Sequence, residues 1–177
     1  KKSVFFFDAP ISGGENGAIT GKLSIMVGGE KKIFNKLTKI LGHYSKSLIY
    51  MGNSGSGQIT KMVNQICVAS VIQGLAEGLT LAKVKKLNIN SLIEVISNGA
   101  AQSWQLENRA LTMWKNKFNF GFMNKLMLKD LNIILQQIKK NKINLPVTKK
   151  IRLYYQILIN RGYDKEDTSN LIRLLKR

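Results

Sequence analysis

Cysteine and histidine are nearly absent from this chain, and their scarcity argues against two kinds of protein. The 177 residues include one cysteine, Cys67, and one histidine, His43. A single cysteine forms no disulfide within the chain, which argues against a disulfide-stapled fold. A metal site built from thiolate and imidazole ligands needs several such residues, so we expect no metal. Cys67 lies in an apolar stretch, and we expect a buried structural thiol in a protein of the reducing cytoplasm.

Acidic residues and long apolar runs are also scarce. No stretch of 18 consecutive apolar residues occurs, so we expect no membrane partner. Lysine and arginine number 28 against 10 aspartate and glutamate, for a formal net charge of +18. These cations are spread along the chain without the interleaved aromatic residues that stack on bases, so we expect no nucleic-acid partner. A hydrophobic content of 44% is enough to form a buried core.

The most informative segment is a glycine-rich loop that runs into a long apolar stretch, at residues 52–65. Within it, Lys61 is followed by Asn64 and Gln65. Residues three and four apart share one face of a helix, so these polar side chains form one stripe. A lysine desolvated in such a stripe has a lowered pKa and exchanges protons near neutral pH. The alternative is an ordinary lysine at the edge of a helix.

A second segment, at residues 8–14, reads Asp-Ala-Pro-Ile-Ser-Gly-Gly and follows the apolar run 4–7. The apolar run predicts a buried strand. A turn through Ser12, Gly13 and Gly14 at the end of a strand exposes a hydroxyl and backbone N–H groups, which suit an anion such as a carboxylate. Taken by itself, the triplet is equally compatible with a plain turn.

Four motifs occur in register along the chain. They read DAPISGG at 8–14, GKLSIMVGG at 21–29, GSGQITKMVNQ at 55–65 and KDL at 129–131. Together they closely resemble the β-hydroxyacid dehydrogenase family, which includes 3-hydroxyisobutyrate dehydrogenase and tartronate semialdehyde reductase. The resemblance covers essentially the whole chain. It implies hydride transfer between NAD or NADP and a short β-hydroxyacid or its semialdehyde.

The resemblance also implies a role for each matched residue. Lys61 is then the catalytic general acid/base. The substrate-binding residues are then Ser12, Gly13, Gly14, Asn64 and Gln65, with the first three at the substrate carboxylate. Lys129 contacts the cofactor, and its neighbour Asp130 supports it.

Family members begin with a Rossmann domain, and the glycine fingerprint of that domain is missing from the start of this sequence. No G-x-G-x-x-G opens a helix there. We therefore expect the C-terminal portion of such an enzyme, incomplete and inactive alone. The expected domains are a remnant of the dinucleotide-binding domain at 1–52 and an all-α substrate-binding and dimerisation domain at 53–177.

The expected fold class is mostly α. Edge strands of a Rossmann α/β sheet, at 4–8, 23–27 and 47–51 around a helix at 30–41, precede an all-α domain like that of 6-phosphogluconate dehydrogenase. Further helices are predicted at about 56–85, 91–98, 103–115, 125–141 and 145–160, with a last one capped by residues 167–169.

The predicted helix from residue 56 is apolar nearly all round, so we expect it to be central and buried between other helices. Gly74 and Gly78 would permit close approach of a neighbouring helix. So apolar a helix also predicts a homodimer or homotetramer. The alternative function is a non-catalytic oligomerisation module that uses the same helices only for contacts between subunits.

Overall fold

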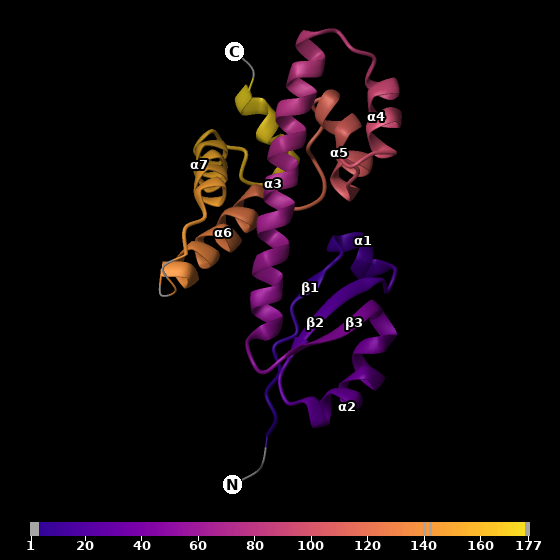
Figure 1. Cartoon of the computed structure of the whole chain (residues 1–177), viewed down its shortest axis with the longest axis vertical. Helices are drawn as coiled ribbons and strands as arrows, with labels where there is room; N and C mark the ends of the chain where they lie inside the picture. Colours follow the sequence, from indigo (N-terminus) through magenta and orange to yellow (C-terminus); the bar gives the residue numbers. More distant parts are fainter. Residues whose placement is uncertain (1–3, 140, 142, 176–177) are drawn as a thin grey trace. The chain divides into compact units, whose positions relative to one another are not determined.

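The computed structural model describes residues 4–139, 141 and 143–175, and it forms two compact units (Figure 1). The first unit, residues 1–64, is called the sheet unit here, and the second, residues 65–177, the helical unit. The fold is mostly helical with one three-stranded sheet. The predicted fold class is confirmed, because a small sheet precedes a helical domain that contains one long helix.

The sheet unit is built on three strands, β1 (Ile11–Ser12), β2 (Leu23–Gly28) and β3 (Ser45–Gly52), in the order β1-β2-β3. β1 runs antiparallel to β2, whereas β3 runs parallel to it. The β2–β3 connection carries α2 (Lys31–Leu41) and a short 3₁₀ turn (Gly42–Tyr44). Alternate residues of β2 point into a small core, which consists of Leu23, Ile25 and Val27 against partly buried Phe7, Phe34, Leu37, Leu41 and Leu48.

Two details of this unit differ from the sequence-based expectation. The predicted strand at 4–8 is wrong: only Asp8 pairs, by an isolated antiparallel bridge to Gly28. Val4 and Phe6 lie largely exposed, because among the described residues no strand pairs with them. A short helix, α1 (Gly14–Ile19), follows β1 and was not predicted.

The long helix α3 (Ser56–Val84) belongs to both units, since the boundary between them falls at residue 64. In the helical unit its buried apolar residues recur three and four positions apart, as expected of one stripe. They are Ala69, Ile72, Ala76, Leu79 and Ala82. The expectation of burial all round is wrong, because another stripe at the same spacing is exposed. This α3 exposed stripe consists of Cys67, Val71, Gly74, Gly78 and Leu81.

The same geometry corrects the expectation for Cys67 and leaves the two glycines of the exposed stripe without a neighbour among the described residues. The thiol of Cys67 is exposed rather than buried, because Cys67 lies about 200° around the helix from Ala69 of the buried stripe. Gly74 and Gly78 have no close neighbour: a Cβ added at either would meet nothing within 4 Å in the described part of the chain. No described helix therefore approaches α3 at these glycines.

By length and composition alone, α3 is also the one helix of the described residues that is able to cross a membrane. Its most apolar window has a mean hydropathy of 1.3, and 39% of that window is buried. Core helices of soluble proteins pass the same test, so this is weak evidence.

The helical unit continues with four helices and a 3₁₀ segment. They are α4 (Ile89–Ser97), α5 (Trp104–Trp114), α6 (Asn124–Lys139), α7 (Pro146–Asn160) and η2 (Thr168–Leu175). α4 packs with α5, and α6 packs with α7 (Figure 1). The predicted cap of α5 is confirmed, since Ser103 Oγ accepts a hydrogen bond of 3.0 Å from the Leu106 amide. Pro146 begins α7 as predicted.

Candidate functional site

The predicted general acid/base, Lys61, lies near the start of α3 in the sheet unit and is half-buried, as is Asn64. On the same turns, Ile59 and Val63 are 47% and 54% exposed. Lys61 and Asn64 are therefore more protected than Ile59 and Val63, and they share this protection with their apolar neighbour Met62.

Gly57 explains which way the face that carries Lys61 points. Gly57 precedes Lys61 by one helical turn, so the two residues share a face of α3. A Cβ at Gly57 would collide with the backbone oxygen of Met26 and would lie 2.8 Å from a carboxylate oxygen of Asp8. The face that carries Lys61 is therefore the one that begins in direct contact with β2 and with the segment that leads to β1.

Asp8 connects that segment to α3. Its carboxylate accepts hydrogen bonds from the backbone amides of Gly55 (2.6 Å) and Gln58 (2.8 Å), the residue before α3 and the third residue of the helix. Asp8 is 7% exposed, and its backbone pairs with Gly28 through two hydrogen bonds of 3.1 and 2.8 Å. A carboxylate at this position also interacts favourably with the positive end of the helix dipole.

The predicted carboxylate-binding turn follows on the same segment. Ser12 ends β1 and is half-buried, Gly13 has a φ of 130°, and Gly14 has a φ of 62° as it begins α1. Both glycines adopt backbone angles that residues with a Cβ rarely reach, which accounts for the Gly-Gly pair. The sheet unit thus contains Ser12, the two glycines, Lys61 and Asn64.

The other two predicted site residues, Gln65 and Lys129, are linked through Asp130 in the helical unit. Gln65 is 4% exposed, and its side-chain nitrogen donates to Asp130 Oδ2 at 2.7 Å. The Lys129 ammonium pairs with Asp130 Oδ1 at 3.0 Å, and the Lys129 side chain is 61% exposed. Asp130 therefore holds the Gln65 amide on one oxygen and the Lys129 ammonium on the other. The predicted substrate role of Gln65 and cofactor role of Lys129 stay predictions.

A hollow of about 560 Å³ opens at the carboxyl ends of β2 and β3, entirely within the sheet unit. It is lined by Val4, Phe5, Phe6, Gly29, Glu30, Lys31, Lys32, Asn53 and Ser54. Ligands of open α/β sheets bind outside the carboxyl ends of parallel strands. None of these residues was predicted as a site residue from the sequence, because the hollow exists only once β2 and β3 are paired.

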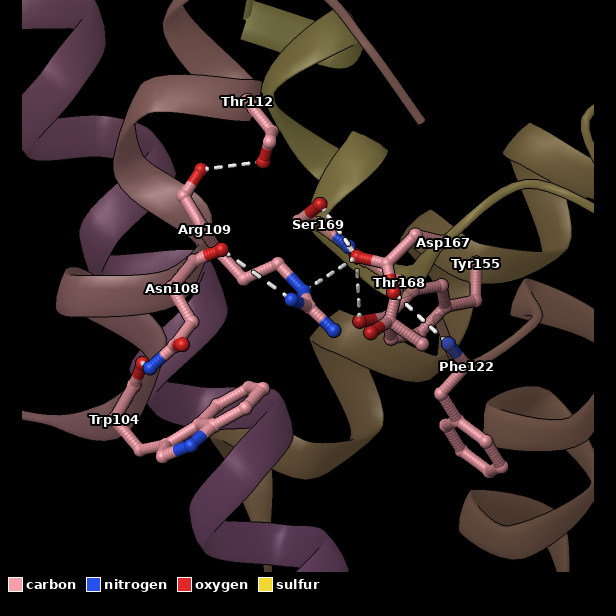
Figure 2. Close-up of polar contacts among 9 residues, drawn as sticks. All are labelled: Trp104, Asn108, Arg109, Thr112, Phe122, Tyr155, Asp167, Thr168 and Ser169. Atoms are coloured by element: carbon pink, nitrogen blue, oxygen red, sulfur yellow. Dashed lines mark hydrogen bonds and ion pairs between the residues drawn. The ribbon is translucent and has the colours of Figure 1, made fainter. Parts of the chain in front are cut away.

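A buried polar cluster in the helical unit was also missed. The carboxylate of Asp167 accepts four hydrogen bonds: from Arg109 Nε at 3.1 Å, from the Phe122 amide at 2.9 Å, and from the Ser169 amide and hydroxyl at 3.0 and 2.6 Å (Figure 2). Asp167 is fully buried. The Arg109 guanidinium lies 4.9 Å from the Trp104 ring centroid and 4.8 Å from that of Phe120, so both aromatic rings contact its charge.

Tyr155 borders this cluster, with its hydroxyl donating to the Thr168 carbonyl at 3.1 Å (Figure 2). Burial, and secondarily the negative charge of Asp167, raise the pKa of Tyr155 well above its usual value, although the hydrogen bond to Thr168 acts in the opposite direction. The cluster ties α5, the 115–123 loop and η2 together. Its polar groups hydrogen-bond to one another, so we assign the cluster a role in stability rather than in catalysis.

Comparison with known proteins identifies the family. Residues 55–175 match the family described as NAD-binding of NADP-dependent 3-hydroxyisobutyrate dehydrogenase, and residues 1–52 match the NAD binding domain of 6-phosphogluconate dehydrogenase. The cofactor of this family is NAD or NADP. The match to a dehydrogenase family supports a soluble protein.

Relatives extend the match over nearly the whole chain. An uncharacterized oxidoreductase of Shewanella frigidimarina is 45% identical over 99% of this chain and 60% of its own length. The 2-hydroxy-3-oxopropionate reductase of Escherichia coli is 36% identical over 97% of this chain and 59% of its own. The chain thus spans about three-fifths of the length of these relatives.

A solved structure gives the same result for the fold. The 3-hydroxyisobutyrate dehydrogenase of Mycobacterium tuberculosis, solved with L-serine, superimposes with a TM-score of 0.88 at 26% identity, over 97% of this chain and 61% of that one. Sequence motifs, family match and fold therefore lead to one assignment: the chain belongs to the β-hydroxyacid dehydrogenase family of NAD(P)-binding oxidoreductases.

Proposed function

We propose that the protein transfers hydride between a nicotinamide and the CH–OH carbon of a short β-hydroxyacid or its semialdehyde, with Lys61 as the general acid/base. The observation that carries the proposal is that Lys61 and Asn64 are half-buried on the face of α3 that begins at Gly57, against β2 and the Asp8 segment, whereas Ile59 and Val63 are exposed. A lysine amine is one of the side chains that serve as general acids and bases in enzymes.

Each of the other site residues has a part in this proposal. Ser12, Gly13 and Gly14 hold the substrate carboxylate through the turn that ends β1, and Asn64 and Gln65 bind the substrate from α3. Lys129 contacts the cofactor. The relatives named for 2-hydroxy-3-oxopropionate and for 3-hydroxyisobutyrate support a short hydroxyacid as the substrate class.

The hollow at the carboxyl ends of β2 and β3 fits part of the cofactor. Asn53 and Ser54 offer polar groups there, and Lys31 and Lys32 offer positive charge to an anionic molecule. When bound, NAD(P) supplies or accepts the hydride. Lys61 moves the accompanying proton: neutral Lys61 takes the hydroxyl proton in oxidation, and its ammonium returns a proton to the oxygen in reduction.

The α3 exposed stripe favours self-association, and we propose a homodimer or homotetramer in the cytoplasm. Apolar residues on one helix face, with two glycines that leave it flat, are a surface that a second copy would cover. A non-catalytic oligomerisation module would use this stripe and nothing else. It gives no reason for the protected polar pair on the same helix, so the enzyme is the preferred function.

The deciding experiment measures turnover of the complete protein on short β-hydroxyacids with NAD and with NADP. Lys61→Ala should lower kcat by about 10²–10⁴ on the best substrate, the range for a positioned general acid/base. Lys61→Arg should not restore activity, because a guanidinium stays protonated. Lys83→Ala is the control: it removes an exposed lysine of the same helix, whose ammonium contacts Trp114 in the helical unit, and it should leave kcat unchanged. Near wild-type kcat in Lys61→Ala would refute the proposed role.

A further inference from the structure

Asp8 has no catalytic or binding role in the proposed function, yet its carboxylate lies at the start of α3. It lies 47 and 50 residues before its two hydrogen-bond donors, Gly55 and Gln58. A helix begins with backbone N–H groups that lack partners, and a capping box satisfies two of them with two side chains of the helix itself. Gly55 has no side chain to do so. The single carboxylate of Asp8, reaching from another segment, accepts from both of these amides.

Asp8 is itself held tightly, so it can fix what it binds. Its backbone N–H and its backbone carbonyl are both hydrogen-bonded to Gly28. A Cβ at Gly28 would lie 2.5 Å from one carboxylate oxygen, and a Cβ at Gly57 would lie 2.8 Å from the other. Only glycine at these two positions leaves room for the carboxylate. The close packing at Gly28 and Gly57 therefore fixes β2, the Asp8 carboxylate and the first turn of α3 relative to one another.

We propose that Asp8 is a positioning residue for the proton-transfer chemistry: by completing the first turn of α3, it fixes Lys61 relative to the turn of Ser12–Gly14. The segment that provides Asp8 runs on directly into that turn, so one short stretch of chain holds both the start of the catalytic helix and the carboxylate site. This proposal rests on the proposed role of Lys61.

The physical consequence is specific to the start of the helix. Without acceptors for its first amides, the opening turn of a helix frays, and Lys61 lies only one turn beyond Gly57. A displacement of the reacting group by about 1 Å is enough to cost about 10²-fold in rate. Loss of Asp8 should therefore reduce turnover far more than an equal loss of stability elsewhere in the chain.

The chain offers a matched control in the cap of α4. Asn88 also accepts two backbone hydrogen bonds with one side chain, from Asn90 at 2.9 Å and Ser91 at 3.1 Å. Asn88→Ala removes the same number of capping bonds from a helix that carries no proposed site residue. If Asp8 only stabilises the protein, Asp8→Ala and Asn88→Ala should have similar kinetics.

The experiment compares these variants in the complete protein. Asp8→Ala should lower kcat by about 10- to 100-fold with an unchanged KM for the cofactor, whereas Asn88→Ala should stay within about twofold of wild type. Asp8→Asn retains one accepting oxygen and should fall between. Hydrogen exchange supplies a readout independent of activity: the Gly55 and Gln58 amides should exchange faster in Asp8→Ala and at the wild-type rate in Lys61→Ala.

A double variant separates this proposal from the proposed function. If Asp8 acts through Lys61, adding Asp8→Ala to Lys61→Ala should lower kcat no further, because the group that it positions is already gone. An equal further loss in the double variant would overturn the proposal, as would kcat in Asp8→Ala no lower than in Asn88→Ala. Wild-type turnover in Lys61→Ala alone would instead refute the proposed function.

Discussion

Replacing Asp167 by alanine tests the contribution of the buried polar cluster to the stability of the helical unit. The variant loses a fully buried carboxylate that accepts four hydrogen bonds, and it leaves the Arg109 charge and the Phe122 and Ser169 amides without this partner. Removing one partner of a buried ion pair costs about 3–5 kcal/mol, because the other charge stays buried without compensation. Native domains are stable by about 5–15 kcal/mol, so the loss should be a large share of the total.

The adjacent carboxylate provides the control. Glu166 pairs with Arg173 at 3.1 Å and accepts a hydrogen bond from Asn170 at 3.0 Å, but its side chain is 20% exposed, against 1% for Asp167. Glu166→Ala changes the net charge by the same amount, so self-repulsion of the +18 chain rises equally in both variants. A partly exposed pair contributes at most about 1 kcal/mol. The two neighbouring substitutions should therefore differ by about 2–4 kcal/mol in the free energy of unfolding.

Tryptophan fluorescence during urea denaturation measures this difference selectively. Both tryptophans of the chain, Trp104 and Trp114, lie at the ends of α5 in the helical unit. Trp104 also contacts the Arg109 guanidinium, so its emission reports on the cluster itself. The Asp167→Ala midpoint should fall well below that of Glu166→Ala, with a similar dependence on urea concentration. Equal midpoints would refute the reasoning, because burial of the ion pair would then have no energetic consequence.

The remaining predictions concern titration and assembly. The raised pKa of Tyr155 means that the unfolded chain loses this proton first, so the contribution to stability is present below pH about 10 and is lost as pH rises above it. Tyr155→Phe should flatten that loss in denaturation curves between pH 9 and 11, and a parallel loss in both proteins would contradict it. Leu81→Asp in the α3 exposed stripe should dissociate the proposed oligomer in light scattering, whereas Lys83→Ala should leave the mass unchanged; a monomeric wild type at micromolar concentration would contradict the assembly.

Local signals in the sequence were enough to predict most helices. The hydroxyl of Ser103 caps α5 and Pro146 opens α7, because capping and proline placement depend only on neighbouring residues. Long-range partners could not be predicted in this way. Asp8 finds its amides 47 and 50 residues along the chain, and Arg109 finds Asp167 58 residues along. No short pattern marks either pairing.

The errors have physical causes of the same kind. The apolar run at 4–7 has strand propensity, but a strand also needs a pairing partner, and the described residues provide one only at Asp8. The composition of α3 predicted an apolar helix. It did not predict which stripe of the helix the neighbouring helices would cover. Of the site, the sequence predicted Lys61 and Asn64 on a common stripe of one helix. It did not reveal the hollow beside β2 and β3, which paired strands create.

The exposed position of Cys67 makes this chain chemically addressable at one point. The sequence contains a single cysteine, and its thiol lies on the α3 exposed stripe. A maleimide should therefore attach once per chain, with no competing thiol to remove by mutation. Cys67 belongs to the surface proposed to meet a second copy. If a second copy covers this surface, the alkylation of Cys67 should slow as the protein concentration rises, and no residue of the proposed active site has to be altered to measure it.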